Sequence, residues 1–169
     1  NKNVILNTAI NTSSAVYLIF IDGDCIANPK FIQRHVELAK RQQFVTGSVI
    51  RLDAETSNRV TIENIKSTDV FSYSWLLAHK QIDRIGTKLK TNLYGTKISS
   101  VLERLSPVKK VWNGGNTGGW KEDIVQVNGF DESLRYGAED VELGVRLNNL
   151  GVFGRHIRYT APLLHLDHP

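Results

Sequence analysis

The sequence predicts an α/β protein in which helices flank a mixed, largely parallel sheet. The first observation is the unbroken apolar run Tyr17–Ile21, whose aromatic and β-branched residues are typical of a strand that is covered on both faces. The second is that two further strand-like segments, 44–50 and the start of the tail 159–169, alternate with segments of helical periodicity. We therefore expect residues 17–21 to form a central strand.

The helices are expected from local signals. Residues 4–15 have helical spacing, and a second helix should begin at Asn28-Pro29, because proline is tolerated in the first helical turn, and end near Gln43. Gly47 lies inside the strand 44–50, where glycine often marks a bulge or a close approach of another group. Further helices are expected in pieces over 70–105, over 121–127, and from Glu139 to the residue before Gly151.

Composition excludes several classes of protein. With 169 residues, 41% hydrophobic and 22% charged, the chain can form one ordinary core. A formal charge of +4 favours anionic ligands but is too weak to indicate nucleic acid. The single cysteine, Cys25, excludes an internal disulfide and any CxxC metal site. No segment approaches the ~20 apolar residues that span a bilayer, and we expect a cytoplasmic protein.

The start of the chain indicates a piece of a longer protein. The sequence contains no methionine, so we expect that it does not begin at its own translation start. A parallel sheet whose central strand lies as early as residue 17 should also have earlier strands before it. We therefore expect a single partial domain.

A pair of carboxylates follows the first strand. Asp22 and Asp24 are two residues apart, which in extended chain places both side chains on one side, and Gly23 between them allows a ligand to approach the backbone. Ligands of parallel sheets gather at the carboxyl ends of the strands. Hard oxygen donors at such a place suit Mn²⁺ or Mg²⁺. The alternative is an Asp-Gly turn with both acids solvated.

Four glycines lie between two tryptophans in the segment 112–120. Glycine allows close approach of other groups, and the indoles of Trp112 and Trp120 offer flat apolar faces of the kind that sugar rings need. The alternative is a tight turn flanked by core tryptophans. Neither GxGxxG after a strand nor GxxxxGK[ST] is present, so the sequence shows no phosphate-binding loop of these types.

Basic residues dominate the segment 80–110. The most economical interpretation is a solvated helical face, and the sharper one is a surface that meets a phosphorylated acceptor or an anionic membrane. The basic residues are Lys80, Arg84, Lys88, Lys90, Lys97, Arg104, Lys109 and Lys110, against only Asp83 and Glu103.

Two further groups of chemically active residues lie near the end of the chain. Glu139 and Asp140 begin an amphipathic helix, where acids ordinarily stabilise the helix dipole. His165 and His168 follow an apolar strand, and either could be a late metal ligand or an exposed side chain.

Taken in order, these segments resemble the inverting nucleotide-sugar glycosyltransferases of the GT-A fold, in family two and its galactosyltransferase-like relatives. Each motif is short, but their order along nearly the whole chain is specific. The matching segments are Asn7 with the strand and acids over 17–26, Gly114-Gly115-Asn116 with 127–132, Tyr136–Leu143 with Arg146-Leu147 and Gly151, and His165–Pro169.

The resemblance implies transfer of a sugar from a nucleotide-diphosphate donor, UDP-linked in our expectation, to a glycan or lipid-linked acceptor, in polysaccharide, lipopolysaccharide or glycan synthesis. It implies that Asp140 is the catalytic base, with Glu139 as its rival. Asp22, Asp24 and His165 would hold Mn²⁺ or Mg²⁺. The donor and acceptor contacts it implies are Asn7, Trp112, Gly114, Gly115, Asn116, Trp120 and Glu139.

It also implies a division of the chain. Residues 1–53 would carry the metal strand and the end of the nucleotide-binding part, 54–110 a basic helical insertion that could touch the inner face of a membrane, and 111–169 the acceptor and catalytic part. Two other classes stay open, a carbohydrate-binding module without chemistry and another metal-dependent phosphate-handling enzyme such as a nucleotidyltransferase. Whether this chain is active alone is also open.

Overall fold

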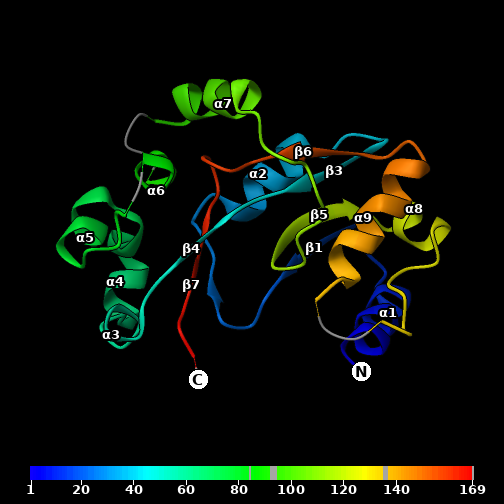
Figure 1. Ribbon diagram of the computed structural model, residues 1–169, viewed down its shortest axis with the longest axis horizontal. Coiled ribbons are helices and arrows are strands. Elements are labelled where there is room, and N and C mark those ends of the chain that lie inside the picture. Colours follow the sequence, from blue (N-terminus) through cyan, green and yellow to red (C-terminus); the bar gives the residue numbers. More distant parts are fainter. Residues whose placement is uncertain (84, 92–94, 135–136, 169) are drawn as a thin grey trace. The chain divides into compact units, whose positions relative to one another are not determined.

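The computed structural model describes residues 1–83, 85–91, 95–134 and 137–168 (Figure 1). Arg84, Tyr136 and Pro169, which belong to the expected basic segment and family motifs, lie outside the described residues. The chain forms two compact units of interleaved segments. Unit 1 contains 1–21, 35–46 and 108–156, and unit 2 contains 22–34, 47–107 and 157–169.

Unit 1 is built on a four-stranded sheet with the order β1-β5-β3-β6. The pairs β1–β5 and β5–β3 are antiparallel, and β3–β6 is parallel. The elements are α1 (Lys2–Thr12), β1 (Tyr17–Ile21), β3 (Gln43–Thr46), β5 (Asn116–Trp120), α8 (Lys121–Gln126), α9 (Glu139–Asn149) and β6 (Phe153–His156).

Unit 2 combines a three-stranded sheet, in the order β2-β7-β4, with a run of short helices. Here β2–β7 is antiparallel and β4–β7 is parallel. The elements are β2 (Cys25–Ile26), β4 (Val49–Arg51), α3 (Ala54–Ser57), α4 (Ile62–Lys66), the 3-10 helix η1 (Asp69–Phe71), α5 (Tyr73–Ala78), α6 (Ile85–Lys90), α7 (Gly95–Leu105) and β7 (Leu163–His165). The division between the units falls within α2 (Phe31–Leu38), after Arg34.

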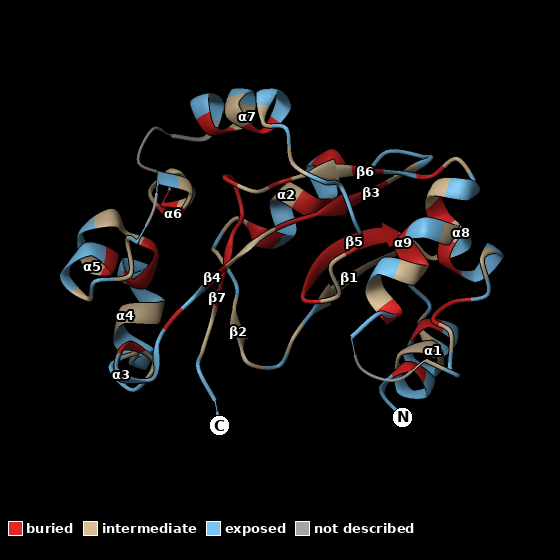
Figure 2. Ribbon diagram, in the orientation of Figure 1, coloured by how far each residue is buried: buried red, intermediate tan, exposed pale blue. Residues whose placement is uncertain are grey.

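The mixed α/β class is confirmed, but the expected position of the first strand is wrong. Within the described residues, β1 pairs only with β5, so it is an edge strand of an antiparallel pair rather than the centre of a parallel sheet. Its residues are half-buried or exposed (Figure 2). Leu18 and Phe20 pack against the core on one face of the strand, and on the other face the Tyr17 ring packs against Trp120 with ring centres 5.3 Å apart.

The glycine-rich segment is a tight turn followed by a strand. Gly114 and Gly115 lie in a turn that the Asn116 amide closes by donating to the Asn113 carbonyl oxygen at 2.9 Å, and Gly118 and Gly119 lie on β5. β5 lies between β1 and β3, and most of it is buried (Figure 2). The reason is close packing, since a Cβ on Gly118 would lie 2.7 Å from the His35 ring and 2.8 Å from the Tyr17 hydroxyl. A Cβ on Gly119 would lie 3.2 Å from the Trp112 ring. Glycine is therefore needed where side chains press on the sheet.

The predicted strand 44–50 is two strands in two different sheets. β3 ends at Thr46 in unit 1 and β4 begins at Val49 in unit 2, so Gly47 marks the place where the chain leaves one sheet for the other. The cores of the units are likewise separate. Trp112, Phe44 and Phe130 centre the core of unit 1, and that of unit 2 contains Ile50, Val70, Phe71, Leu76 and Leu164.

Two helices end where the local signals predicted, whereas the helix expected to end near Gln43 is wrong in length, since α2 ends at Leu38 and Gln43 begins β3. α8 is followed by Asn128 and Gly129 at φ of 66° and 65°, and α9 is followed by Gly151 at φ 88°. These left-handed residues end the helices as the sequence predicted. No helix in the described part of the chain is long and apolar enough to cross a membrane.

Candidate active site

Unit 2 brings together one carboxylate and two imidazoles. Ligand atoms of Asp24, His165 and His168 all lie within 4.8 Å of one another. The Asp24 Oδ2 atom is 2.9 Å from His168 Nε2 and 3.5 Å from His165 Nε2. A carboxylate oxygen and two ring nitrogens that converge in this way are a donor set for a divalent cation.

The small sheet of unit 2 explains why these residues meet. His165 on β7 is the backbone partner of Cys25 on β2 and of Arg51 on β4. Partner residues project from the same face of a sheet, so Cys25, His165 and Arg51 form a row. On the other face, Ile26, Leu164 and Ile50 pack into the core. Burial of that face thus fixes His165 on the outer side.

The backbone of Asp24 is also tied to the tail of the chain. The Leu166 amide donates a hydrogen bond to the Asp24 carbonyl oxygen at 2.9 Å. The neighbouring Cys25 thiol lies 3.6 Å from Asp24 Oδ1. Burial, and then the charge of Asp24, raise the pKa of Cys25 to about 12, so the thiol is protonated at neutral pH and donates to this carboxylate.

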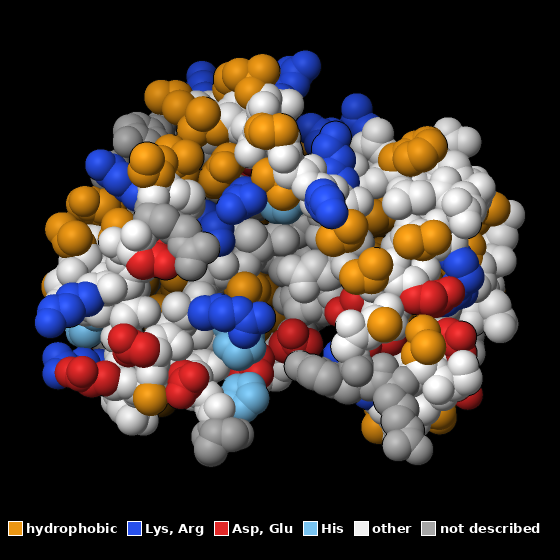
Figure 3. Space-filling model, in the orientation of Figure 1, with side chains coloured by type: hydrophobic (Ala, Val, Ile, Leu, Met, Phe, Trp, Pro, Cys, Tyr) orange, Lys and Arg blue, Asp and Glu red, His pale blue; other side chains and the backbone are white. Residues whose placement is uncertain are grey.

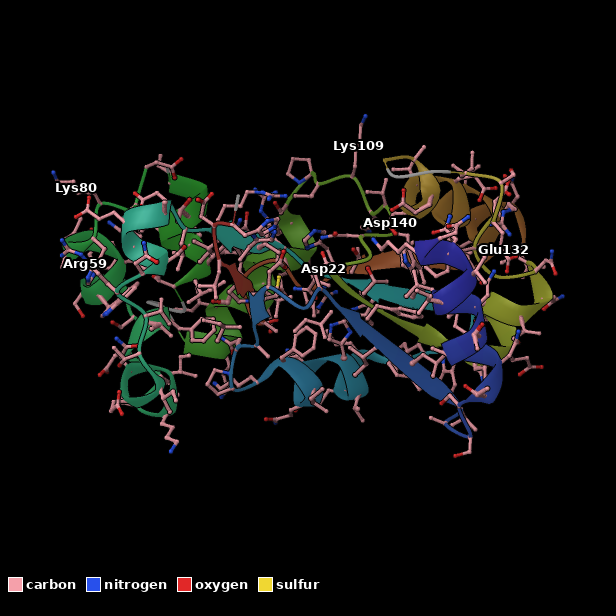
Figure 4. The ribbon with its side chains drawn as sticks, turned by 90° about the horizontal axis from the view of Figure 1, so that it is seen from below. Asp22, Arg59, Lys80, Lys109, Glu132 and Asp140 are labelled. Carbon is pink, nitrogen blue, oxygen red and sulfur yellow. The ribbon has the colours of Figure 1, made fainter. Side chains whose placement is uncertain are left out.

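The structure separates the two aspartates that the sequence paired. Asp22 follows β1 (Figure 4), and its carbonyl oxygen accepts a hydrogen bond of 3.2 Å from the Cys25 amide. The chain therefore turns between them instead of staying extended, and Asp22 is not part of the Asp24–His165–His168 group found among the described residues. His168, which the sequence offered only as an alternative to His165, joins that group.

A cavity of about 420 Å³ in unit 2 begins at Arg51, the neighbour of His165. Four basic and two acidic residues line it, so its charge is positive overall. It is lined by Val49, Ile50, Arg51, Asp53, Lys80, Gln81, Asp83, Gly86, Thr87, Lys90 and Arg158. Sequence analysis missed Arg51, although it follows the strand 44–50 just as Asp22 follows the strand 17–21.

Unit 1 holds the expected base. Asp140 lies in the first turn of α9 (Figure 4), and its Oδ2 atom accepts a hydrogen bond of 3.0 Å from the Gly114 amide. A Cβ on Gly114 would lie 2.6 Å from the carboxylate, so glycine is required for this contact. The family motifs at 114 and 140 are thus in direct contact, a relationship that the sequence did not reveal.

Glu139 is buried and engaged at the start of the same helix. It accepts hydrogen bonds from the Gly137 amide at 2.7 Å and from the Lys2 ammonium at 3.4 Å. Burial alone raises its pKa, but hydrogen bonds from its own amide and that of Gly137, together with Lys2, outweigh burial and hold the pKa below its usual value. Glu139 therefore helps to fix the helix start, and Asp140 is the better candidate base.

The two tryptophans do not form the expected platform. Trp112 is 1% exposed, and Phe20, Phe44 and Phe130 surround its ring, so it is a core residue that offers no face to a sugar. Trp120 is half-buried. The Arg41 guanidinium lies 4.2 Å from its ring centre, and its indole N–H donates to the Lys40 carbonyl oxygen at 2.9 Å.

Two other expected contact residues have structural partners. Asn116 is fully buried on β5, 3.1 Å from the His35 ring, and the adjoining Gly115 is buried as well. The Asn7 amide donates to the Phe130 carbonyl oxygen at 2.8 Å and to Glu132 at 2.9 Å, so it joins α1 to the loop that carries Glu132 (Figure 4). Asn7 also lines a polar cavity of about 650 Å³ in unit 1.

The basic segment 80–110 is divided between the units, and Lys109 in unit 1 projects into solvent (Figure 4). Asp24, His165 and His168 belong to unit 2, and Asp140 with Gly114 belongs to unit 1.

Mixed sheets flanked by helices are consistent with part of a GT-A-like domain. The model of glycosyl transferase family 2 matches residues 2–104, and that of the N-terminal domain of galactosyltransferase matches residues 97–169. The chain belongs to glycosyl transferase family 2, and the resemblance seen in the sequence is confirmed. No curated protein matches it. Enzymes of this family act on nucleotide-sugar donors and commonly use divalent metals.

Proposed function

We propose that this enzyme transfers a sugar from a nucleotide-diphosphate donor, UDP-linked in the first instance, to an acceptor hydroxyl with inversion at the anomeric carbon and with the help of a divalent cation. The observation that carries the proposal is the group of Asp24, His165 and His168. Its acceptor would be a growing glycan or a lipid-linked sugar in polysaccharide or lipopolysaccharide synthesis. The family membership supports the class of reaction.

Asp24, His165 and His168 would hold the cation. Two imidazoles favour a transition metal such as Mn²⁺ over Mg²⁺, which prefers oxygen donors and retains water. When bound, the cation would neutralise charge that develops on the diphosphate leaving group.

Arg51 would complete the binding of the diphosphate. It shares a face and a backbone pairing with His165, so its guanidinium is available to oxygens of an anion bound at the cation. Planar guanidinium groups bind phosphate oxygens in bidentate fashion. The positive lining of the adjoining cavity supports the same role.

Asp140 would accept the proton of the attacking hydroxyl. The Gly114 amide fixes one carboxylate oxygen, which orients the group without neutralising it. General-base assistance of this kind contributes ~10²–10⁴-fold to the rate. Trp120, Asn116, Gly115 and Asn7 remain proposed only as supports of the sugar-binding region, and Trp112 is no longer part of it.

The test is transfer from a panel of nucleotide sugars to glycan and lipid-linked acceptors, with Mn²⁺, with Mg²⁺ and with a chelator. We expect Mn²⁺-dependent transfer, and NMR of the product should show the inverted anomeric configuration. Asp140→Asn should lose transfer by at least about 10²-fold while nucleotide binding in Mn²⁺ persists. Glu122→Gln, an exposed acid of the same unit, is the control. Loss of nucleotide binding in Asp140→Asn, or activity in the chelator, would contradict the assignment.

A further inference from the structure

Helix α7 in unit 2 is amphipathic in the reverse sense. The side chains it buries are polar, since Ser99 is fully buried and Glu103 is 8% exposed. Three of its four large apolar side chains face outward, with Ile98 and Val101 each 54% exposed and Leu105 75% exposed, and Leu102 is half-buried. A helix of a globular protein normally turns its apolar stripe toward the core. Packing within unit 2 therefore does not explain the apolar stripe of α7.

The buried side of α7 is held by specific polar contacts. One oxygen of Glu103 accepts hydrogen bonds from the Tyr159 amide at 2.9 Å and from the amide and hydroxyl of Thr160, both at 2.8 Å. The Arg34 guanidinium lies 3.8 Å from the other oxygen. Rotating the helix to bury its apolar stripe would turn Glu103 away and take this acceptor from the buried Tyr159 and Thr160 amides, which is costly. The outward orientation is thus fixed.

The charges on the outward side of α7 all have one sign. Ile98, Val101 and Leu105 are spaced i, i+3 and i+7, so they form one stripe, and Lys97 and Arg104 are exposed next to it. Glu103 is the only acid in the helix, and it points inward. Figure 3 shows the hydrophobic side chains over α7 with Lys and Arg side chains on either side.

We propose that α7 lies on an anionic membrane surface, with Ile98, Val101 and Leu105 inserted at the boundary between headgroups and acyl chains. Lys97 and Arg104 would then contact lipid phosphates. An exposed apolar stripe with cationic neighbours is the pattern of helices that lie in the membrane interface. The cytoplasmic leaflet carries the anionic lipids that this charge requires. The inference does not depend on the proposed reaction.

Sedimentation of the purified chain with vesicles tests the proposal. We expect binding to vesicles of phosphatidylcholine mixed with phosphatidylglycerol, little binding to phosphatidylcholine alone, and weakening by salt. Ile98→Gln with Leu105→Gln should lower the affinity by at least about tenfold, and Lys97→Glu by about tenfold. The controls are Ile62→Gln with Leu77→Gln, also exposed apolar side chains of unit 2, and Lys66→Glu. They should bind as the unchanged protein does.

A second readout does not require removal of the apolar stripe. Val101→Trp places an indole on it, and brominated lipid in anionic vesicles should quench the added emission, whereas Leu77→Trp should gain no quenching. Equal binding by the α7 variants and their controls would overturn the proposal. So would a change of oligomeric state in Ile98→Gln with Leu105→Gln in the absence of lipid, since the stripe would then join protein copies. Unchanged thermal unfolding shows that the variants fold.

Discussion

The Gly114 amide donates a hydrogen bond of 3.0 Å to the Asp140 carboxylate, and the contact leaves no room for a side chain at position 114. Two residues that are 26 positions apart in the sequence therefore depend on each other for the position of the carboxylate. The amide holds the carboxylate, and the missing Cβ lets the amide come close enough to do so.

Gly114→Ala should displace the carboxylate and so impair transfer. An alanine Cβ would lie 2.6 Å and 2.7 Å from the two oxygens of Asp140, so the side chain must rotate away. We expect a fall in kcat of about 10²-fold, because small misplacement of a catalytic group is enough for such a loss. Steady-state kinetics with a Mn²⁺-binding measurement checks this.

Asn149→Ala is the control for that variant. Asn149 is exposed at the far end of α9, the helix whose first turn contains Asp140, and alanine favours a helix. It should keep wild-type kcat. If Gly114→Ala is as active as this control, the Asp140–Gly114 contact does not matter for the reaction.

Mn²⁺ affinity should distinguish the two aspartates. Asp24→Asn and His168→Ala should each weaken binding by at least about tenfold, because each removes one donor of a three-donor set. Asp22→Asn should change it by less than about threefold, since Asp22 lies outside that set. Isothermal titration or the EPR signal of free Mn²⁺ measures these affinities without any turnover.

His79→Ala is the control for these variants, because His79 stacks on Trp75 and is not in the cluster. An Asp22→Asn variant that loses binding as Asp24→Asn does would return Asp22 to the metal site. Retention of wild-type affinity by His168→Ala would leave Asp24 and His165 as the ligands.

The sequence predicts local structure correctly where the conformational preferences of neighbouring residues determine it. The ends of α8 and α9 follow from Asn128-Gly129 and Gly151, which adopt the left-handed conformation that stops a helix. Position at the end of a strand and at the start of a helix singled out the acids at 22, 24, 139 and 140 as candidates, and only the resemblance implied that Asp140 is the base.

Long-range relationships could not be read in the same way. An apolar run reports that a strand has a buried side, but not how many neighbours it has, so β1 was placed at the centre of its sheet rather than at the edge. Glycine is rare in strands, and only the packing of His35, Tyr17 and Trp112 explains β5. The pairing of Cys25 with His165 joins residues that are far apart in the sequence, and it decides which aspartate meets the histidines.

Trp112 should matter for stability rather than for sugar binding. Its side chain is fully buried among aromatic rings, so Trp112→Ala leaves a large cavity and should lower the free energy of unfolding by about 3–5 kcal/mol. Trp120→Ala, at a half-buried position, should lower the free energy of unfolding by clearly less. Urea denaturation compares them. If Trp112→Ala leaves stability unchanged and weakens sugar binding, Trp112 would be part of a sugar-binding platform after all.

His35 should make stability depend on pH. Burial lowers its pKa from 6.5 to about 4, although the hydrogen bond to Asn116 acts in the opposite sense. The unfolded chain therefore binds a proton more readily, so the stabilisation from neutral His35 is complete above pH 6.5 and is lost as the pH falls toward 4. A shift of this size corresponds to at most about 3 kcal/mol.

His35→Gln removes the titrating group and keeps a donor for Asn116, so its free energy of unfolding should fall less between neutral pH and pH 4 than that of the unchanged protein. His79→Gln, in the other unit, should retain the fall that His35 causes. Urea denaturation at several pH values measures the difference. If the two variants lose stability in parallel with acid, His35 is not the group responsible, and its ring must find a proton-accepting partner in the folded state that offsets its burial.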